Sequence, residues 1–218
     1  YRHVWLIKTA LVSVDLYGVY VKPEKLTDSL WKIPVEVTLR NDDFENKRVR
    51  VECEILDDTG ATVSKATCGG IISQKDKRTL CLQAETESPR LWSPDSPTLY
   101  TARAHVFIGK REVDVYDVRF GFRNVVADSQ KGLFINGKHY KIKGLCGHAD
   151  CGLMGKAVPD NIHRYKVQLM KEMGGNGYRC SHYPQAETLM DERIVFEGEK
   201  LSVPVVFYDD NLNTLEWW

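Results

Sequence analysis

The sequence has no excess of charge of either sign and no long apolar run. Its 218 residues include 30 Lys and Arg and 30 Asp and Glu, so the formal net charge is zero. A balanced charge provides no electrostatic attraction to nucleic acid or to an anionic membrane surface. No apolar stretch approaches the roughly 20 residues of a transmembrane helix, and the first residues lack a signal-peptide pattern. Neither nucleic acid nor a membrane is therefore expected as a partner.

The cysteines are few and do not form a dense disulfide framework. There are six, at positions 53, 68, 81, 146, 151 and 180. A chain of this length can build a core without covalent cross-links. Cys53 and Cys81 stand in strand-like segments and could pair across a sandwich, but free thiols are the expected state. Reduced cysteines are expected, and no compartment follows from them. A cytoplasmic location is weakly favoured, and the sequence leaves the compartment open.

The first half of the chain shows the apolar and polar alternation that is typical of half-buried β-strands. Turn residues such as Asp57-Asp58-Thr59-Gly60 and Gly109-Lys110 separate the alternating segments. Several short strands with such turns predict an antiparallel β-sandwich. The apolar positions of three of these segments are Ile33, Val35, Val37 and Leu39, then Val49, Val51, Cys53 and Ile55, then Val113, Val115 and Val118.

The alternation weakens after Arg123, which predicts a domain boundary near residues 123–128. We therefore expect a sandwich domain over residues 1–123 and a second domain over residues 124–218. The second domain opens with Asn136-Gly137 between two apolar segments, which is the strongest short signal for a β-hairpin.

Two strand-like segments then flank an amphipathic helix. Asp160 is expected to cap the start of this helix, and Gly174 is expected to end it in a left-handed conformation. Ile162, Tyr165, Leu169 and Met173 recur at helical spacing and predict the buried face. His163 is expected on the exposed side. A strand, helix and strand in this order predict a parallel, right-handed crossover.

Polar residues follow both of these strands. His148 and Asp150 follow the first, and Arg179 and His182 lie at the end of the second. Because parallel strands bring their carboxyl ends to the same edge, His148 and His182 are expected to face one pocket.

A metal site is an alternative use of the same segments. Zinc favours thiol and imidazole ligands, but the spacing here is Cys-x-His in each segment rather than a paired knuckle. No metal ligand is therefore assigned. The residues that offer such groups are Cys146, His148, Cys151, Cys180 and His182.

Several motifs, taken in order, resemble the family 2 glycoside hydrolases, which include β-galactosidases, β-glucuronidases and β-mannosidases. The resemblance covers about residues 1–191, with residues 24–88 similar in pattern only. Each motif is short, but their common order and spacing make the resemblance specific. The motifs are residues 91–100 (LWSPDSPTLY), 119–123 (RFGFR), 132–138 (GLFINGK), 143–144 (KG), 148–150 (HAD), 169–171 (LMK) and 179–184 (RCSHYP).

The resemblance implies an immunoglobulin-like sandwich followed by the first part of a (β/α)8 TIM barrel. It implies a retaining hydrolase of terminal β-glycosides, with β-galactosides as the first choice and a carbohydrate as the partner. The intact parent could be a homo-oligomer. No cofactor is expected, although a divalent or monovalent cation near the barrel mouth remains open.

The resemblance also implies roles for four residues. His148 and His182 match positions that line the sugar subsite, and Asp150 matches an acceptor for a sugar hydroxyl. Arg179 matches a residue that keeps the catalytic nucleophile ionised, because an adjacent cation lowers the pKa of a carboxyl group. Trp5, Trp31 and Trp92, by contrast, are expected to be packing residues rather than sugar platforms.

The two catalytic carboxyl groups are not identified in this chain. Retaining glycosidases place them roughly 5–5.5 Å apart, and in the family the acid/base Glu follows an Asn. This sequence contains no Asn-Glu dipeptide. We therefore expect a fragment that is inactive by itself, with residues 192–218 left without a role. The alternative is a non-catalytic β-sandwich interaction module with a degenerate barrel appendage.

Overall fold

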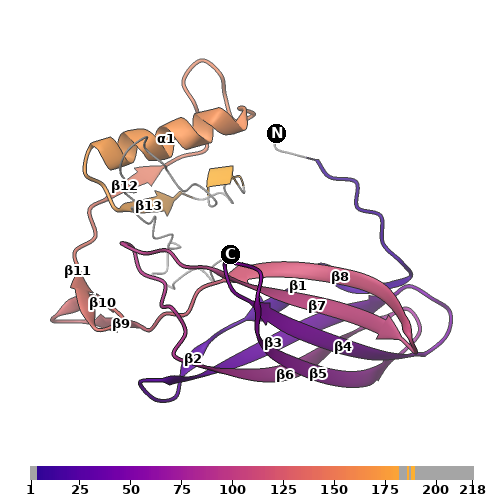
Figure 1. Ribbon diagram of the computed structural model, residues 1–218. Coiled ribbons are helices and arrows are strands. Elements are labelled where there is room, and N and C mark those ends of the chain that lie inside the picture. Colours follow the sequence, from indigo (N-terminus) through magenta and orange to yellow (C-terminus); the bar gives the residue numbers. More distant parts are fainter. Residues whose placement is uncertain (1–3, 182–185, 187, 190–218) are drawn as a thin grey trace. The chain divides into compact units, whose positions relative to one another are not determined.

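The computed structural model describes residues 4–181 and residues 186, 188 and 189. They divide into two compact units, whose elements are labelled in Figure 1. The sandwich unit contains Leu6–Trp92 and Thr98–Asn124, and the α/β unit contains Val4, Trp5, Ser93–Pro97 and the described residues from Val125 onward. Among the described helices, none has the length and apolar character that a membrane span requires.

The first sheet of the sandwich is built around one long strand. Strand β3 pairs antiparallel with β1, β2 and β6, and its pairing with β6 runs without interruption from Leu30 to Asn41. The bounds of these strands are β1 Val12–Val21, β2 Glu24–Lys25, β3 Leu30–Asn41 and β6 Asp76–Glu87.

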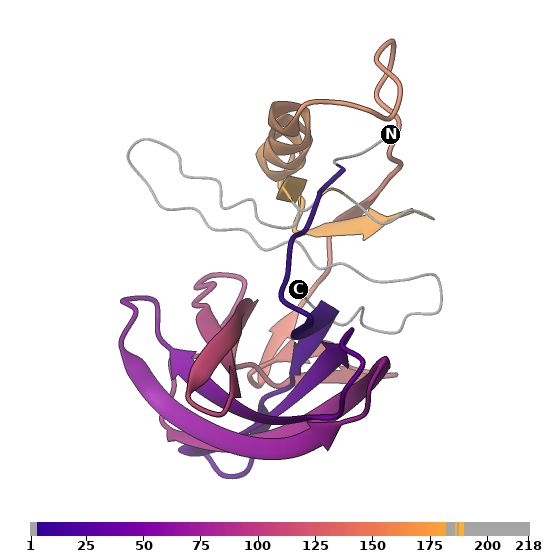
Figure 2. The same cartoon turned by 90° about the vertical axis from the view of Figure 1, so that its right-hand side faces the viewer.

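The second sheet has four antiparallel strands in the order β5-β4-β7-β8. Its edge strand β5 also approaches β6 of the first sheet, and β8 approaches β1. Figure 2 shows the strands of both sheets curving around a common interior. The bounds are β4 Lys47–Leu56, β5 Thr62–Ile72, β7 Tyr100–Ile108 and β8 Arg111–Phe120.

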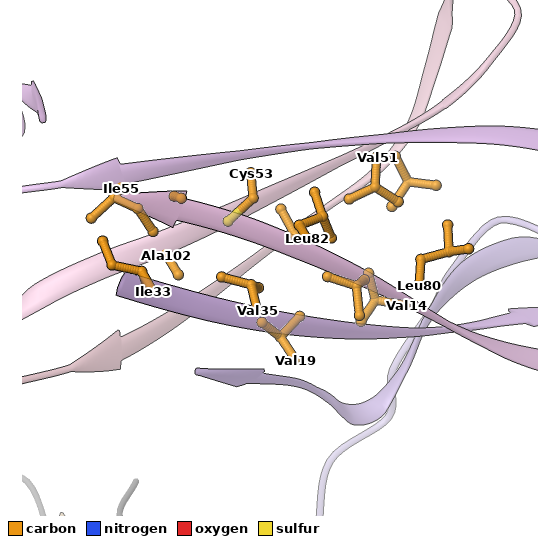
Figure 3. Close-up of a cluster of buried hydrophobic side chains, with 14 of the residues drawn as sticks. Val14, Val19, Ile33, Val35, Val51, Cys53, Ile55, Leu80, Leu82 and Ala102 are labelled. Carbon is orange, nitrogen blue, oxygen red and sulfur yellow. The ribbon is translucent and has the colours of Figure 1, made fainter. Parts of the chain in front are cut away.

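The core lies between these two sheets and confirms the predicted sandwich. Ile33 and Val35 from β3 lie opposite Ile55 and Cys53 from β4 (Figure 3). All four are at most 1% exposed. Burying an aliphatic side chain of this size contributes about 1.5–3 kcal/mol. The alternate residues of β3 and β4 therefore hold the two sheets together, because their apolar side chains are buried between the sheets.

A buried amide closes one end of the sandwich. Asn41, the last residue of β3, is fully buried, and its Nδ2 donates to the carbonyls of Glu45 at 2.8 Å, Ile72 at 3.3 Å and Ser73 at 3.1 Å. Its Oδ1 accepts from the N–H of Asp43 at 3.0 Å. One side chain thus bonds four backbone groups of two turns, and its own buried amide, which would be costly to leave unpaired, finds its partners there.

In strand β8 the side chains that face the core are not all those expected, which were Val113, Val115 and Val118. A bulge at Val106 and Phe107 shifts the register, so Asp114 pairs with Val106 while Glu112 pairs with Phe107. A bulge inserts one extra residue and reverses which side chains face inward beyond it. Val115 is consequently 43% exposed, whereas Val113 and Val118 pack against the core as expected.

The α/β unit opens with a three-stranded antiparallel sheet, β11-β10-β9. Its strands are β9 Val125–Asp128, β10 Gly132–Ile135 and β11 Lys138–Tyr140. The predicted hairpin is confirmed, because Ile135 pairs with Lys138 across Asn136 and Gly137, whose φ values are 52° and 79°. Two positive φ values are the signature of a type I′ turn.

The segment Ser93–Pro97 is fastened to this hairpin by a carboxylate. Asp95 accepts from Lys138 Nζ at 2.6 Å and from Tyr140 Oη at 3.0 Å. The hydrogen bond from Lys138 is the main reason that the pKa of Asp95 lies below its usual value.

A parallel β–α–β unit follows, as the sequence predicts. Strand β12 (Gly144–Gly147) pairs parallel with β13 (Gly177–Cys180), and helix α1 (Asp160–Glu172) connects them. The helix ends as expected: Gly174 has φ +76° and donates to the Lys171 carbonyl, and Gly175 donates to the Met170 carbonyl. These two bonds form a Schellman motif.

The start of α1 differs by one residue from the expected one. Pro159 occupies the N-cap position and makes no side-chain cap bond, while Asp160 is the first helical residue. Asp160 therefore stabilises the first turn through its negative charge at the positive end of the helix, rather than as the cap itself.

The buried face of α1 is not the predicted one. His163, Val167 and Met170 are buried, and Val167 and Met170 pack with Tyr178 of β13 and with Leu189. Tyr165 and Met173 are instead 55% and 73% exposed, and Leu169 is 40% exposed. Apolar side chains of α1 cover more than half of its circumference, so their spacing is compatible with two different buried faces. Packing against β13 buries the face that carries Val167 and Met170, and His163 is buried with it, contrary to expectation.

The tryptophans follow the expectation in two of three cases. Trp31 is 2% exposed and packs edge to face on Phe122, with ring centroids 5.6 Å apart. Trp92 lies so close to Gly121 that a Cβ there would overlap it, and the Arg123 guanidinium stacks 4.9 Å from its ring. Trp5 was expected to pack but is 68% exposed, because it lies before the first strand.

Candidate functional site

The parallel register of β12 and β13 brings two polar strand ends together. Cys146 pairs with Arg179 and Gly147 pairs with Cys180, and the N–H of Ser181 donates to the Gly147 carbonyl at 3.2 Å. His148 therefore leaves β12 at the same edge where Ser181 leaves β13. His182, which the sequence places in the same pocket, lies outside the described residues.

Arg179 is held by a thiol and a hydroxyl. Its Nη1 donates to Cys146 Sγ and to Ser181 Oγ, both at 3.3 Å, and Cys146 Sγ also contacts Ser181 Oγ. The hydrogen bond with Ser181, followed by that with Arg179, lowers the pKa of the Cys146 thiol. The cluster fixes one arm of a guanidinium at a strand end, the position from which such a group can pair with a carboxylate.

His148 and Asp150 lie on the loop that follows β12, and both are exposed. Ala149 between them is 5% exposed. Lys166 of α1 reaches back to this loop, where its Nζ lies 3.3 Å from the His148 carbonyl and 3.1 Å from the Asp150 carbonyl. The Asp150 carboxylate is 3.9 Å from Lys156 Nζ. The loop thus presents an imidazole and a carboxylate that can bond hydroxyl groups.

Tyr178 of β13 is buried next to Gly147 of β12. Tyr178 is 5% exposed, and burial raises the pKa of its phenol to about 12. Gly147 lies directly against the Tyr178 ring, and a Cβ on Gly147 would overlap the ring atoms. Glycine at this position is what allows β12 to pass the ring.

The metal alternative receives no support from the described part of the chain. Across residues 4–181, 186, 188 and 189, no three His, Cys, Asp or Glu side chains gather closely enough to hold an ion. Cys53 and Cys81 do not form the disulfide that could have linked them, and Cys53 is buried while Cys81 is exposed.

Sequence reasoning assigned Arg179, His148 and Asp150 but missed Lys166, Cys146 and Ser181 as residues that hold them. No local pattern marks Lys166, because its contact depends on how the loop folds back over the helix. The strand pairing could have indicated Cys146, since equal positions on parallel strands lie side by side.

The comparisons with known proteins define the class. Residues 13–123 match the model of glycosyl hydrolases family 2, and residues 126–193 match the family 2 TIM barrel domain. A sandwich followed by the beginning of a TIM barrel is thus the architecture of a glycoside hydrolase. The chain belongs to glycosyl hydrolases family 2.

Individual relatives agree with this assignment. The chain is 34% identical over 191 residues to the β-galactosidase BoGH2A of Bacteroides ovatus, covering 88% of this chain and 22% of that protein. It is 30% identical over 207 residues to a β-glucuronidase of Bacteroides fragilis, covering 88% and 28%. A family 2 member from Bacteroides cellulosilyticus has a similar structure, with TM-score 0.81, 26% identity and coverage of 92% and 25%. The chain therefore spans about a quarter of the length of these relatives.

Proposed function

We propose that this chain supplies part of the sugar-binding subsite of a retaining β-glycosidase, and that it does not hydrolyse glycosides by itself. The observation that supports the proposal is the parallel pairing of β12 and β13, which sets Arg179 and His148 at one edge. Arg179 orients and keeps ionised the nucleophilic carboxylate. His148, Asp150 and His182 bond the sugar hydroxyls.

A β-galactoside is the proposed substrate. The supporting observation is the long match to a β-galactosidase, 34% identity over 191 residues, while a β-glucuronidase of Streptococcus agalactiae reaches the same identity over 100 residues. The two sugars differ in the configuration at C4 and also at C6, where a glucuronide carries a carboxylate that calls for a cationic partner. A comparison of the two aryl glycosides under the same conditions therefore separates the two specificities.

The activity can be measured in a chimera. Residues 126–193 of this chain would replace the matching segment of the Bacteroides ovatus β-galactosidase, and kcat/KM would be measured with aryl β-galactoside and aryl β-glucuronide. We expect the pure chain to turn over neither substrate and the chimera to hydrolyse the galactoside. Arg179→Ala in the chimera should lower kcat/KM by about 100-fold or more, as loss of a catalytic electrostatic contact does.

Lys131 provides the matched control, because it is exposed in the turn before β10. Lys131→Ala should leave kcat/KM unchanged. Turnover by the pure chain would refute its proposed inactivity. A folded chimera in which Arg179→Ala retains full kcat/KM would refute the role of Arg179 and favour the non-catalytic interaction module.

A further inference from the structure

We propose that Lys166 is a positioning residue that locks the loop after β12 and thereby sets the direction of His148 and Asp150. The proposal rests on the proposed function, because it takes these two side chains as sugar contacts. Lys166 itself touches no substrate. It acts from helix α1 through the backbone of the loop.

The geometry of Lys166 is that of a clamp. One ammonium group bonds two carbonyls, those of His148 at 3.3 Å and Asp150 at 3.1 Å. Three N–H groups are available on an ammonium, and bonds from a charged donor are stronger than neutral ones. Holding both carbonyls fixes the His148–Ala149 and Asp150–Cys151 peptide planes, and the side chain of Ala149 between them is buried.

The next part of the loop is closed by its own backbone hydrogen bonds. Cys151 and Gly155 exchange two backbone hydrogen bonds of 2.9 Å, and they close a tight turn in which Leu153 has φ +66°. The clamp therefore stands between strand β12 and a closed turn. Releasing it would free the three residues that carry the two proposed sugar contacts.

Fixing the orientation of His148 and Asp150 favours sugar binding, because both side chains are exposed. A hydrogen-bonding group that is already aimed at a hydroxyl loses less conformational freedom when the sugar binds. A loosened loop would lose that advantage without losing either functional group. The effect should appear as weaker binding rather than as altered chemistry.

The first measurement tests the clamp in the full chain. Hydrogen–deuterium exchange of peptides that span residues 147–156 would be compared for the wild type, Lys166→Met, Lys166→Arg and the exposed control Lys131→Met. Lys166→Met should speed exchange in this loop by about tenfold, as expected for loss of a bond to a charged group. Exchange in β3 and β4 should not change. Lys166→Arg should restore much of the protection, because it retains the charged donor.

The second measurement uses the chimera described above. Lys166→Met should raise KM for the aryl β-galactoside several-fold with little change in kcat, and Lys166→Arg should reverse most of the rise. Unchanged loop exchange in Lys166→Met overturns the clamp. Faster loop exchange with unchanged KM, while His148→Ala raises KM, overturns the positioning role and leaves the proposed function intact. If neither Lys166→Met nor His148→Ala changes KM, the sugar-contact assignment fails and the positioning role falls with it.

Discussion

At the scale of the residue, the surroundings of each thiol decide its chemistry. Cys53 lies in the sandwich core, where burial raises the pKa of its thiol to about 12. Cys146 is exposed at the end of β12, and its hydrogen bonds with Ser181 and Arg179 lower the pKa of its thiol. The thiolate is the reactive form of cysteine. The same residue type is therefore inert at position 53 and reactive at position 146.

We expect iodoacetamide to alkylate Cys146 well before Cys53 in the native chain. A lowered pKa means that the thiolate of Cys146 is already present at a pH where an ordinary thiol is still protonated. Its alkylation rate should therefore reach half of its maximum at a lower pH than that of a free cysteine, whose pKa is about 8.5. Mass spectrometry of peptides after timed labelling from pH 6 to pH 10 measures both rates.

Variants of the neighbouring residues provide the control. Ser181→Ala and Arg179→Ala should each move the half-maximal pH of Cys146 alkylation upward, with the larger shift for Ser181, the main cause of the lowered pKa. Cys53 should react only after denaturant is added. If Cys146 titrates like a free cysteine in the folded wild type, the described cluster does not persist in solution.

At the scale of the element, the sequence predicted which segments form strands and helices better than it predicted which side they bury. The alternation in β3 and β4 determined both element and face, because two-residue periodicity leaves one arrangement. In β8 the bulge changes which side chains face the core beyond Glu112. No residue pattern in the sequence predicted this bulge. In α1 the apolar residues form two competing stripes, and packing against Tyr178 decides between them.

For the candidate site, the sequence predicted which residues come together but not the contacts that hold them. The order strand, helix, strand and the parallel pairing were enough to bring Arg179 and His148 to one edge. The contacts that hold them were not predictable. Lys166 reaches its two carbonyls only because the loop folds back over the helix, which is a tertiary property.

Gly147 tests the close packing of β12 on β13. We expect Gly147→Ala to destabilise the α/β unit by about 1–3 kcal/mol, the usual effect of inserting a methyl group into a filled space. A Cβ at this position would overlap the buried Tyr178 ring. Chemical denaturation followed by a signal specific to the α/β unit measures the change.

Gly152→Ala is the matched control, since a Cβ at that position would meet no atom within 4 Å. It should be neutral or slightly stabilising. Combining Gly147→Ala with Tyr178→Leu should be less harmful than the sum of the two single changes, because neighbouring residues couple. Equal stability of Gly147→Ala and Gly152→Ala would contradict the close approach of Gly147 and Tyr178.

At the scale of the whole molecule, the two units bury separate cores. The larger core draws on β1, β3, β4, β5, β6, β7 and β8 and lies wholly between Val12 and Phe122. The smaller core consists of Val167, Met170, Tyr178 and Leu189, with Cys180 beside it. A unit that contains its own core can in principle fold alone. The sandwich meets this condition far better than the α/β unit does.

We therefore expect residues 6–124, expressed alone, to unfold in one cooperative transition at nearly the temperature of the sandwich in the full chain. Two sheets that bury their apolar faces against each other need no contribution from the later residues. Limited trypsin digestion of the full chain should cut first in the exposed turn at Lys131, between β9 and β10, and leave the sandwich intact. Circular dichroism and mass spectrometry of the fragments measure both outcomes. Early cleavage within β3, β4 or β7, or gradual melting of residues 6–124, would mean that the sandwich depends on the α/β unit for its stability.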